Sequence, residues 1–255
     1  MSIKISVITV CHNSSETIRE TIKSVLSQKN SVIEYIILDA ASNDGTMQIV
    51  SEYNDSIDII ISEPDRGIYD GMNKGIKAAS GDIIGFLNSD DFYTSSSVLE
   101  KVTEVFNNPT IMACFGDLCY VDRYDVSKIV RHWKSSRFVP GLFSKGWCPP
   151  HPTFFVRRVI YERYGGFDLS YKIAADVELM MRFLEIYSIP VIYIPEILVH
   201  MRMGGETNKN IKNVFLQNQE IWSALKQKDL SHYFFRFFCG KLLSRGKQFF
   251  SRPKL

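Results

Sequence analysis

Short apolar runs alternate with amphipathic segments between residues 4 and 87. The apolar runs are rich in β-branched residues and predict four strands: Ile5–Cys11, Ile33–Asp39, Ile57–Ser62 and Ile83–Leu87. Between them, apolar residues at helical spacing predict three helices: Glu16–Gln28, Thr46–Tyr53 and Ile68–Ala79. The strands are apolar almost throughout, as parallel strands covered on both faces are. The pattern therefore predicts a doubly wound α/β fold.

The periodicity is less regular after Asn107. Further strands are predicted at Ile111–Phe115, Leu118–Val121 and Val191–Ile194, and helices at Val159–Tyr164, Val177–Ile186 and around Asn210–Leu225. No polar linker interrupts the chain, so we expect one domain over residues 1–230. Its second half, residues 108–230, is expected to cover a site that the first half, residues 1–107, forms.

Polar residues follow each strand of the first half at its carboxyl end. The carboxyl ends of parallel strands meet at one edge of the sheet, where doubly wound α/β folds bind ligands. The residues concerned are Cys11-His12-Asn13, Asp39-Ala40-Ala41-Ser42, Ser62-Glu63 and Asn88-Ser89-Asp90-Asp91. The candidate site is therefore expected at this edge.

The composition excludes several classes of protein. With 45% hydrophobic, 13% aromatic and 23% charged residues, the 255-residue chain is neither disordered, collagen-like nor a coiled coil. Its 30 basic and 28 acidic residues nearly balance, which argues against nucleic acid as a partner. Residues 1–128 carry 10 basic and 19 acidic side chains, however, whereas residues 129–255 carry 20 and 9. The two halves are therefore expected to face different partners.

The cysteines and the first residues indicate a reducing compartment. Five cysteines without a C-x2-C pair fit neither a disulfide framework nor a zinc site. Residues 1–5 lead directly into the first strand, without the charged and apolar regions of a secretion signal. No apolar stretch approaches the roughly 20 residues of a membrane-spanning helix. We expect a cytoplasmic protein that meets a membrane only at its surface.

The last residues differ in composition from the rest of the chain. Ser231–Leu255 holds six basic residues, six phenylalanines and no acidic residue. This composition is typical of a segment at a membrane surface. The alternative is a helix whose phenylalanines pack on the domain.

Two consecutive carboxylates follow the fourth predicted strand. Asp90 and Asp91 repel each other unless a cation or a proton intervenes. Divalent Mg²⁺ takes oxygen ligands, usually one or two carboxylates with phosphate oxygens, so the segment Asn88-Ser89-Asp90-Asp91 suits Mg²⁺ or Mn²⁺ holding a diphosphate. The alternative is a turn that the carboxylates merely cap.

Three other polar residues each have two interpretations. Asp39 can accept a hydrogen bond from the N–H of a base or from the hydroxyls of a ribose, or it caps its turn. Asp44 fits the capping role better. Arg66, beside a helix N-terminus, suits an anionic group or is a solvated turn residue. Asp176 is either a helix N-cap or a general base that deprotonates a hydroxyl nucleophile.

Signatures of several other α/β enzymes are absent from the sequence. No G-x-G-x-x-G follows the first strand, and neither G-x4-G-K-[ST] nor G-x-S-x-G occurs. The sequence therefore argues against a dehydrogenase, a P-loop NTPase or an α/β-hydrolase.

With its motifs in this order, the chain resembles the family 2 glycosyltransferases, inverting enzymes of the GT-A fold, from about Ile3 to Thr207. The motifs that carry the resemblance are Ser6–Asn13 with Glu16-Thr17-Ile18, Asp39–Thr46, Asn73-Lys74-Gly75, Leu87–Asp91, His151–Phe155, Gly165–Asp168 and Ala175–Leu179 with Arg182. The resemblance implies a Rossmann-like nucleotide-sugar half at residues 1–107. It also implies a smaller acceptor half at residues 108–230, followed by the basic and aromatic tail.

The resemblance implies roles for residues near the nucleotide. Asp39 would accept a hydrogen bond from the uracil ring of a UDP-sugar, with Thr9 and Glu16 near the base and ribose. Arg66 would lie against the base or the diphosphate.

The resemblance also implies a metal site beside the donor sugar. Asp90 would ligate Mn²⁺ or Mg²⁺ through the diphosphate, and His200 is a further ligand, a phosphate contact or a structural residue. Asp91 would lie beside the donor sugar, and Asn88 and Ser89 are further candidates for binding the donor.

On the acceptor side, the resemblance makes Asp176 the catalytic base, which activates the acceptor hydroxyl for in-line attack with inversion. His151 would line the acceptor pocket or is structural. The motif Pro64–Gly75 is similar to enzymes that build bacterial O-antigen and exopolysaccharide repeat units. The implied acceptor is a sugar on polyprenyl diphosphate at the inner face of the cytoplasmic membrane, which the tail would contact.

Two positions depart from the family pattern. Ala175, just before Asp176, stands where many relatives carry Glu, and Asn88 stands where Asp is usual, which removes one charge from the metal site. The departure at Asn88 supports an alternative, a non-catalytic subunit of a polysaccharide synthase that binds a nucleotide-sugar or glycan. Asp90, Asp91 and Asp176 favour an enzyme. A metal-dependent nucleotidyltransferase would leave the acceptor-side motifs unexplained.

Overall fold

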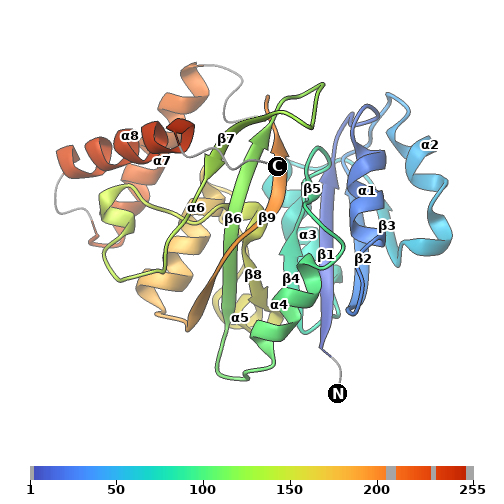
Figure 1. The fold of residues 1–255 in the computed structure, drawn as a ribbon, viewed down its shortest axis with the longest axis horizontal. Helices are drawn as coiled ribbons and strands as arrows, with labels where there is room; N and C mark the ends of the chain where they lie inside the picture. The colour runs from blue at the N-terminus through green and yellow to red at the C-terminus, as the bar shows by residue number, and fades with distance from the viewer. Residues whose placement is uncertain (1–2, 205–210, 231–233, 251–255) are drawn as a thin grey trace.

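Parallel strands form one end of a mixed sheet in the computed structural model, which describes residues 3–204, 211–230 and 234–250 (Figure 1). The strand order begins β3-β2-β1-β4, and neighbours in this part run parallel. These strands are β1 (Lys4–Cys11), β2 (Val32–Asp39), β3 (Ile59–Ser62) and β4 (Ile83–Phe86). The predicted parallel core of an α/β fold is confirmed, because β-branched runs that are apolar on both faces can be buried only between two layers of helices.

The second half of the chain extends the same sheet. The order continues β4-β8-β6-β9-β5, and β7 pairs with β6; β9 runs parallel to β6 and the other added pairs are antiparallel. The added strands are β5 (Phe92–Tyr93), β6 (Ala113–Val121), β7 (Ile129–Trp133), β8 (Phe155–Arg157) and β9 (Val191–Arg202). Together the described strands make one nine-stranded sheet.

Helices cover both faces of this sheet (Figure 1). On one face, α1, α2 and α4 pack against a cluster that includes Ile5 and Val7 of β1. On the other, α3, α5, α6 and α7 pack against a cluster that includes Ile8 and Val10. The helices are α1 (Ile18–Leu26), α2 (Thr46–Ser51), α3 (Ile68–Ala78), α4 (Val98–Phe106), α5 (Arg158–Tyr164), α6 (Ala175–Met181), α7 (Ile211–Gln227) and α8 (Phe234–Phe250). Short 3₁₀ turns occur at Asn54–Ser56, Phe143–Lys145 and His151–Thr153, and a π-helical turn, Arg182–Ile186, continues α6.

The sequence predictions are less accurate in the second half. The strands predicted at Ile111–Phe115 and Leu118–Val121 are parts of one strand, β6. Its pairing with β9 is irregular near Gly116, where the run of hydrophobic residues is interrupted. The strand predicted at Val191–Ile194 continues to Arg202. The pattern did not predict α4, β5, β7 or β8. One hydrophobic cluster contains residues of both predicted halves, and the boundaries at residues 107 and 230 stay predictions.

A buried carboxylate joins the amino-terminal ends of β1 and β2 to the turn before β4. Glu34 accepts hydrogen bonds from Ser6 Oγ at 2.5 Å, from Ser80 N at 2.7 Å and from Lys4 Nζ at 2.9 Å. Burial opposes the charged form, but these donors outweigh it and lower the pKa of Glu34 to about 2.

We predict that Glu34→Gln lowers the free energy of unfolding at pH 7 by about 2 kcal/mol, because an amide cannot replace the charge that these donors stabilise. The folded-state pKa lies below the unfolded one. The stabilisation is therefore present above about pH 4.5 and is lost as the pH falls toward 2. Urea unfolding at pH 7 and pH 3.5 should show a smaller pH dependence for the variant than for the wild type. An equal dependence in both proteins would contradict this role of Glu34.

Candidate active site

The end of β2 presents a buried carboxylate in a fixed orientation. Asp39 accepts hydrogen bonds from Ser42 N at 3.1 Å, from Ser42 Oγ at 2.5 Å and from Ser62 Oγ at 2.6 Å. The Cys11 thiol at the end of β1 lies 3.6 Å from the same carboxylate. The ends of three adjacent parallel strands therefore meet at Asp39, as the sequence predicts.

Asp44 has the turn-capping role that the sequence favours for it. Its carboxylate accepts hydrogen bonds from Thr46 N at 3.0 Å, Thr46 Oγ1 at 2.5 Å and Ser15 N at 3.0 Å. Against the effect of burial, these donors hold the pKa of Asp44 well below its usual range. Asp44 thus ties the start of α2 to the segment before α1.

Thr9 and Glu16 lie in different environments. Thr9 is buried within β1, and its hydroxyl pairs with the hydroxyl of Tyr35 at 3.2 Å. Glu16 is exposed and forms an ion pair of 3.2 Å with Arg123, which follows β6. The structure brings the Glu16 carboxylate to the surface near the second half, and it keeps the Thr9 hydroxyl inside. Their expected contacts with a base and ribose stay predictions.

The segment Asn88–Asp91 forms a tight turn, closed by a hydrogen bond of 3.0 Å from Asp91 N to the Asn88 carbonyl. Ser89 lies against Ser14, with 2.8 Å between the two hydroxyl oxygens. Asp91 is fully buried, and burial together with the neighbouring Asp90 raises its pKa well above the usual range. Within the described chain, Asn88 Oδ1 and Asp91 Oδ1 are buried without a hydrogen-bond partner.

Arg202, at the end of β9, holds this turn through its guanidinium group. Its guanidinium is buried, donates to the Asp90 carbonyl at 2.6 Å and pairs with Glu20 of α1. It also lies 5.0 Å from the centre of the Phe92 ring. Arg202 is not among the residues predicted for the site, because the predicted strand ends at Ile194. The alternation of apolar Val199 and Met201 with polar His200 and Arg202 is the signal that extends the strand.

His200 lies beside the same turn. It is paired with Phe92 in the register of β9 and β5, and the two rings meet edge to face at 5.3 Å. Burial lowers the pKa of His200, which favours the neutral imidazole that can act as a metal ligand. The structure therefore places His200 in β9 beside the turn that contains Asp90, and its role as a metal ligand stays a prediction.

The oxygen atoms of this turn fit a hard divalent cation. The described residues contain no group of three or more His, Cys, Asp or Glu side chains placed to hold a metal. Mg²⁺, however, is usually held by one or two protein carboxylates with phosphate oxygens and water. The unpaired Asn88 Oδ1 and the neighbouring carboxyl groups of Asp90 and Asp91 are oxygen atoms that can ligate an ion in such a shared site.

Asp176 lies in the first turn of α6 and faces the start of α3. The residue at the helix N-cap position is Ala174, and no side chain caps this helix. The Asp176 carboxylate instead accepts a hydrogen bond of 3.1 Å from the Tyr69 hydroxyl. Of the two interpretations from sequence, the N-cap is therefore wrong.

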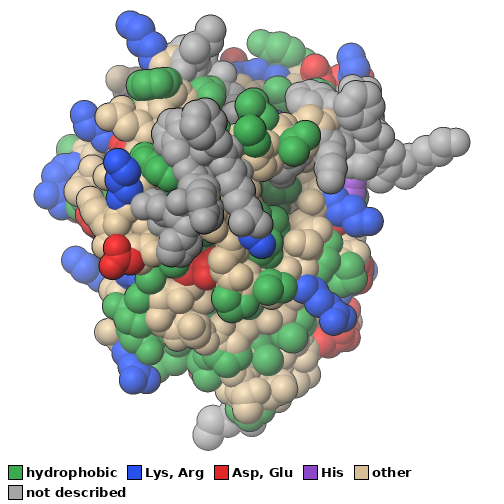
Figure 2. Space-filling model, turned by 90° about the vertical axis from the view of Figure 1, so that its left-hand side faces the viewer, with side chains coloured by type: hydrophobic (Ala, Val, Ile, Leu, Met, Phe, Trp, Pro, Cys, Tyr) green, Lys and Arg blue, Asp and Glu red, His purple; other side chains and the backbone are tan. Residues whose placement is uncertain are grey.

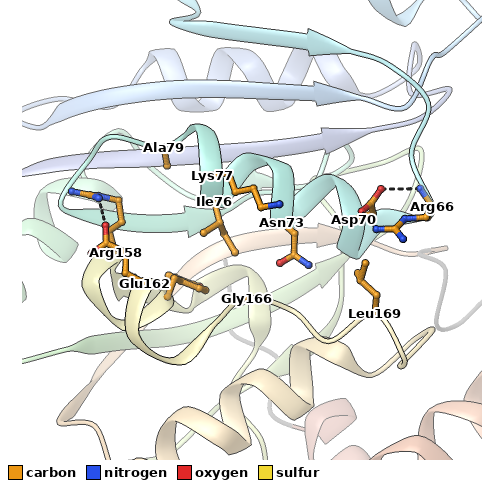
Figure 3. A pocket seen from close by; sticks show the side chains of 11 residues that line it. Arg66, Asp70, Asn73, Ile76, Lys77, Ala79, Arg158, Glu162, Gly166 and Leu169 are labelled. Carbon is orange, nitrogen blue, oxygen red and sulfur yellow. Dashed lines mark hydrogen bonds and ion pairs between the residues drawn. The ribbon is translucent and has the colours of Figure 1, made fainter.

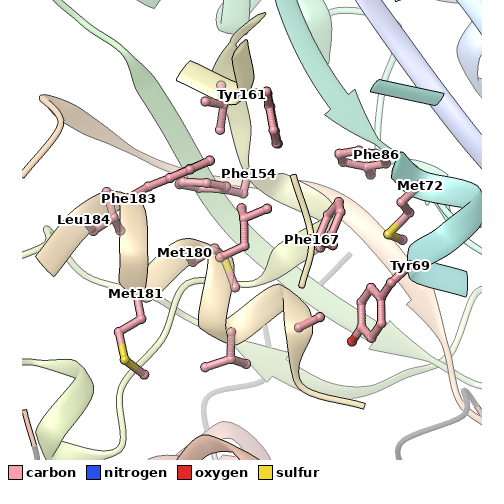
Figure 4. Close-up of a cluster of buried hydrophobic side chains, with 14 of the residues drawn as sticks. Tyr69, Met72, Phe86, Phe154, Tyr161, Phe167, Met180, Met181, Phe183 and Leu184 are labelled. Carbon is pink, nitrogen blue, oxygen red and sulfur yellow. The ribbon is translucent and has the colours of Figure 1, made fainter. Parts of the chain in front are cut away.

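Tyr69, the hydrogen-bond partner of Asp176, belongs to an aromatic cluster with Phe86 and Phe167 (Figure 4). Tyr69 stacks on Phe167 with ring centres 5.5 Å apart, and Phe86 meets Phe167 edge to face at 5.3 Å. The His151 ring lies 5.7 Å from both phenylalanines, and burial lowers its pKa. Among the described residues, none pairs with the buried Nε2 of His151.

A hydrogen-bonded link holds this cluster in place. The Asn73 amide donates to the Phe167 carbonyl and accepts from the Phe167 N–H, both at 2.8 Å. Gly166 precedes Phe167, and a Cβ at Gly166 would overlap the Asn73 amide oxygen. Glycine is therefore required for the close approach of this loop to α3.

A groove of about 480 Å³ lies between α3 on one side and α5 with the loop after it on the other (Figure 3). The exposed Arg66, which pairs with Asp70 at 3.0 Å, lines one end of it. The ion pair of Arg158 and Glu162 lines the other end. Of the residues predicted for the site, Arg66 alone lines this groove. The groove therefore lies beside the predicted nucleotide site and does not contain its carboxylates.

The tail helix α8 packs on the domain through part of its surface. Phe237 is buried against Trp222 of α7, with ring centres 5.8 Å apart. Gly240 lies so close to the Lys145 carbonyl that a Cβ would overlap it. Phe237 therefore follows the inward-packing alternative. The side chains of Phe234, Phe235, Phe249 and Phe250, with residues 231–233 and 251–255, lie outside the described part of the chain.

Other residues of the helix pair α7 and α8 face solvent. Leu242 and Leu243 are 70% and 66% exposed, and Phe215 of α7 is 71% exposed. Figure 2 shows this side of the molecule, where hydrophobic and basic side chains lie interspersed. In the described segments, no helix combines the length and the apolar character needed to cross a bilayer.

Comparison with known proteins identifies sequence and structural relatives. The sequence model of the family described as "Glycosyl transferase family 2" matches residues 6–165. An uncharacterized glycosyltransferase of Mycobacterium tuberculosis is 30% identical over 183 residues, which cover 70% of this chain and 68% of that protein.

Two solved structures share the fold. TarS of S. aureus, residues 1–349 in complex with UDP-GlcNAc, has a TM-score of 0.69 at 18% identity, over 93% of this chain and 73% of that one. The mannosyltransferase PcManGT from Pyrobaculum calidifontis, in complex with GDP-Man and Mn²⁺, has a TM-score of 0.66 at 17% identity, over 96% and 69%. At these identities the likeness shows the fold alone, and it confirms the predicted GT-A fold.

We predict that Arg202→Met lowers the free energy of unfolding by about 2 kcal/mol, because the Asp90 carbonyl loses its charged donor. Glu20→Gln is the matched control. It removes only the partly exposed end of the ion pair and should cost less than about 1 kcal/mol. Urea unfolding at pH 7 measures both effects. Equal losses would mean that the ion pair, rather than the bond to the turn, is the source of the stability.

Proposed function

This chain belongs to glycosyl transferase family 2, and we propose that it transfers one sugar from a UDP-sugar to a polyprenyl-diphosphate-linked acceptor, with inversion. The observation that carries this proposal is the hydrogen bond from Tyr69 to Asp176. Tyr69 lies in the first turn of α3, just after the carboxyl end of β3. Tyr69 therefore holds Asp176 toward the sheet edge where Asp39 and Asp90 lie. A base at this position could act on an acceptor next to the proposed donor site.

The donor is proposed to bind at the ends of β1, β2 and β3. Ser42 and Ser62 hold the Asp39 carboxylate, whereas the Cys11 thiol is a weak donor at 3.6 Å. A uracil N–H can take the place of the thiol at little cost. The exposed guanidinium of Arg66 would contact the diphosphate. The likeness to TarS, solved with UDP-GlcNAc, supports a UDP-sugar.

A divalent cation, Mn²⁺ or Mg²⁺, is proposed to bind at the turn before β5. Asp90 would hold it, with the unpaired Asn88 oxygen and His200 as further candidates. When bound, the ion would supply Lewis-acid stabilisation of the charge that develops on the departing diphosphate. The likeness to PcManGT, solved with Mn²⁺, supports this cofactor.

The transfer would be a single displacement. The Asp176 carboxylate takes the proton of the acceptor hydroxyl while the hydroxyl oxygen bonds to the anomeric carbon. The bond from that carbon to the UDP oxygen breaks on the opposite side, which inverts the configuration. Tyr69 holds one oxygen of Asp176 and leaves the other for the acceptor. The unpaired Nε2 of His151 is proposed to bind an acceptor hydroxyl.

The acceptor is proposed to be presented at the inner face of the cytoplasmic membrane, within O-antigen or exopolysaccharide synthesis. The exposed Leu242, Leu243 and Phe215 offer apolar contacts on α7 and α8. All charged residues of Ser231–Leu255 are basic, which favours binding to an anionic lipid surface.

We predict that Asp176→Asn lowers turnover by roughly 10²–10⁴-fold while UDP affinity changes by less than about twofold, because only the proton acceptor is lost. Turnover is measured as UDP release from a panel of UDP-sugars, with Mn²⁺ or with EDTA. The acceptor is N-acetylglucosamine linked to a short prenyl diphosphate, and UDP affinity is measured by calorimetry.

Tyr69→Phe is the graded variant. It keeps the ring on Phe167, removes the hydrogen bond to Asp176 and should lower turnover by about tenfold. Full activity of Asp176→Asn would remove the base from the proposal. A wild-type protein that binds UDP but releases none from any donor would support the non-catalytic subunit instead.

A further prediction concerns the exposed leucines of α8. Replacing Leu242 and Leu243 by Asp should weaken binding to vesicles that contain one quarter phosphatidylglycerol by at least about tenfold, because the two apolar contacts are lost. Val159→Asp on α5, which is 51% exposed, is the matched control and should bind as the wild type does. Unchanged vesicle sedimentation of the α8 variant would exclude this surface as the membrane contact.

A further inference from the structure

A carboxylate from α7 closes the turn that leads into α6. Glu220 accepts hydrogen bonds from three successive backbone N–H groups, those of Lys172 at 2.9 Å and of Ile173 and Ala174 at 3.0 Å. Both carboxylate oxygens are used. Asp176 follows two residues after the last of these amides, so Glu220 fixes the backbone immediately before it.

Within the described chain, no side chain caps the start of α6. Ala174 at the N-cap of α6 offers no side-chain oxygen, and the first N–H groups of a helix need acceptors from outside it. Side chains of Ser, Thr, Asp or Asn usually provide them at the N-cap. Here a residue 46 positions later in the chain accepts from the N–H of the N-cap residue Ala174 and of the two residues before it.

Helix α7 is itself anchored directly after this contact. Ile221, Ala224 and Leu225 are buried in the cluster that also contains residues of α3 and α6. Beyond Glu220, Gln227 accepts a hydrogen bond of 3.1 Å from the Tyr171 hydroxyl, and Lys228 pairs with Glu178 at 2.8 Å. Contacts therefore hold residues 171–178 to α7 before and after Asp176.

Glu220 also contributes to the electrostatics around Asp176. Burial raises the pKa of the Tyr69 phenol, and the carboxylates of Asp176 and Glu220 raise it further. Tyr69 therefore keeps the proton that it donates to Asp176.

We propose that Glu220 is a positioning residue for the transfer reaction: by holding the amides of residues 172–174, it sets the direction in which Asp176 faces the acceptor. This inference rests on the proposed function, in which Asp176 is the base. Glu220 lies beyond residues 6–165, the part that matches the family.

The first test measures the turn without relying on activity. Amide hydrogen exchange followed by mass spectrometry should show residues 172–174 exchanging about tenfold faster in Glu220→Ala than in the wild type. A peptide from β2 should not change. Gln219→Ala, an exposed neighbour on α7, is the matched control and should exchange as the wild type does. Unchanged exchange at 172–174 would overturn the structural basis of the proposal.

The second test measures the effect on the reaction. With the UDP-sugar that the wild type turns over and the prenyl-diphosphate acceptor, Glu220→Ala should lower kcat by roughly 10- to 100-fold. The KM for the donor and the affinity for UDP should stay within about twofold. Glu220→Gln keeps one oxygen as an acceptor and should recover part of this loss. If Glu220→Ala fails to fold, Glu220→Gln compared with the wild type decides the result.

A double-mutant cycle separates positioning from an independent role. If Glu220 acts through Asp176, adding Glu220→Ala to Asp176→Asn should cost less than about twofold in kcat. The same fold-loss in both backgrounds would overturn the proposal. Full activity of Asp176→Asn alone would instead overturn the proposed base. If no donor supports transfer, the proposed function fails, and the exchange experiment still decides whether Glu220 holds the turn.

Discussion

Burial of the parallel strands on both faces is the constraint that determines where chemistry can occur in this protein. β1, β2 and β4 lie between two layers of helices, so their interior positions are almost entirely apolar. A polar side chain placed there needs a partner inside the protein, as Glu34 has at the opposite edge. Polar groups that meet a ligand are therefore confined to the strand ends, and Asp39 and the turn at Asp90 both lie there.

Helix α3 connects the two halves of this edge. It belongs to the parallel part of the fold, yet two of its side chains hold the second half. Tyr69 binds the Asp176 carboxylate, and Asn73 binds both backbone groups of Phe167. The proposed donor and acceptor sites are thus joined through one helix rather than through a flexible linker. A displacement of α3 would change both sites together.

The remaining supports of the site come from late in the chain. Arg202 holds the turn that contains Asp90, and Glu220 holds the turn before Asp176. In both cases a charged side chain binds backbone groups of a segment that connects regular elements. Such contacts are stronger than neutral ones and fix a loop without covering it with apolar side chains. The reacting groups can therefore stay accessible while their backbone is held.

The sequence alone determined the parallel core and the position of its polar edge, because hydrophobic periodicity and strand ends are local properties that the chain displays directly. It likewise singled out Asp39, Asp90 and Asp176. The tertiary structure decided what local pattern cannot contain. β5 and β8 are too short to show a period, and β9 was predicted to end early at Ile194. The N-cap interpretation of Asp176 failed because Tyr69, 107 residues away, binds its carboxylate. Arg202 and Glu220 bind backbone groups, and no pattern of residue types reveals which amide or carbonyl a distant side chain will reach.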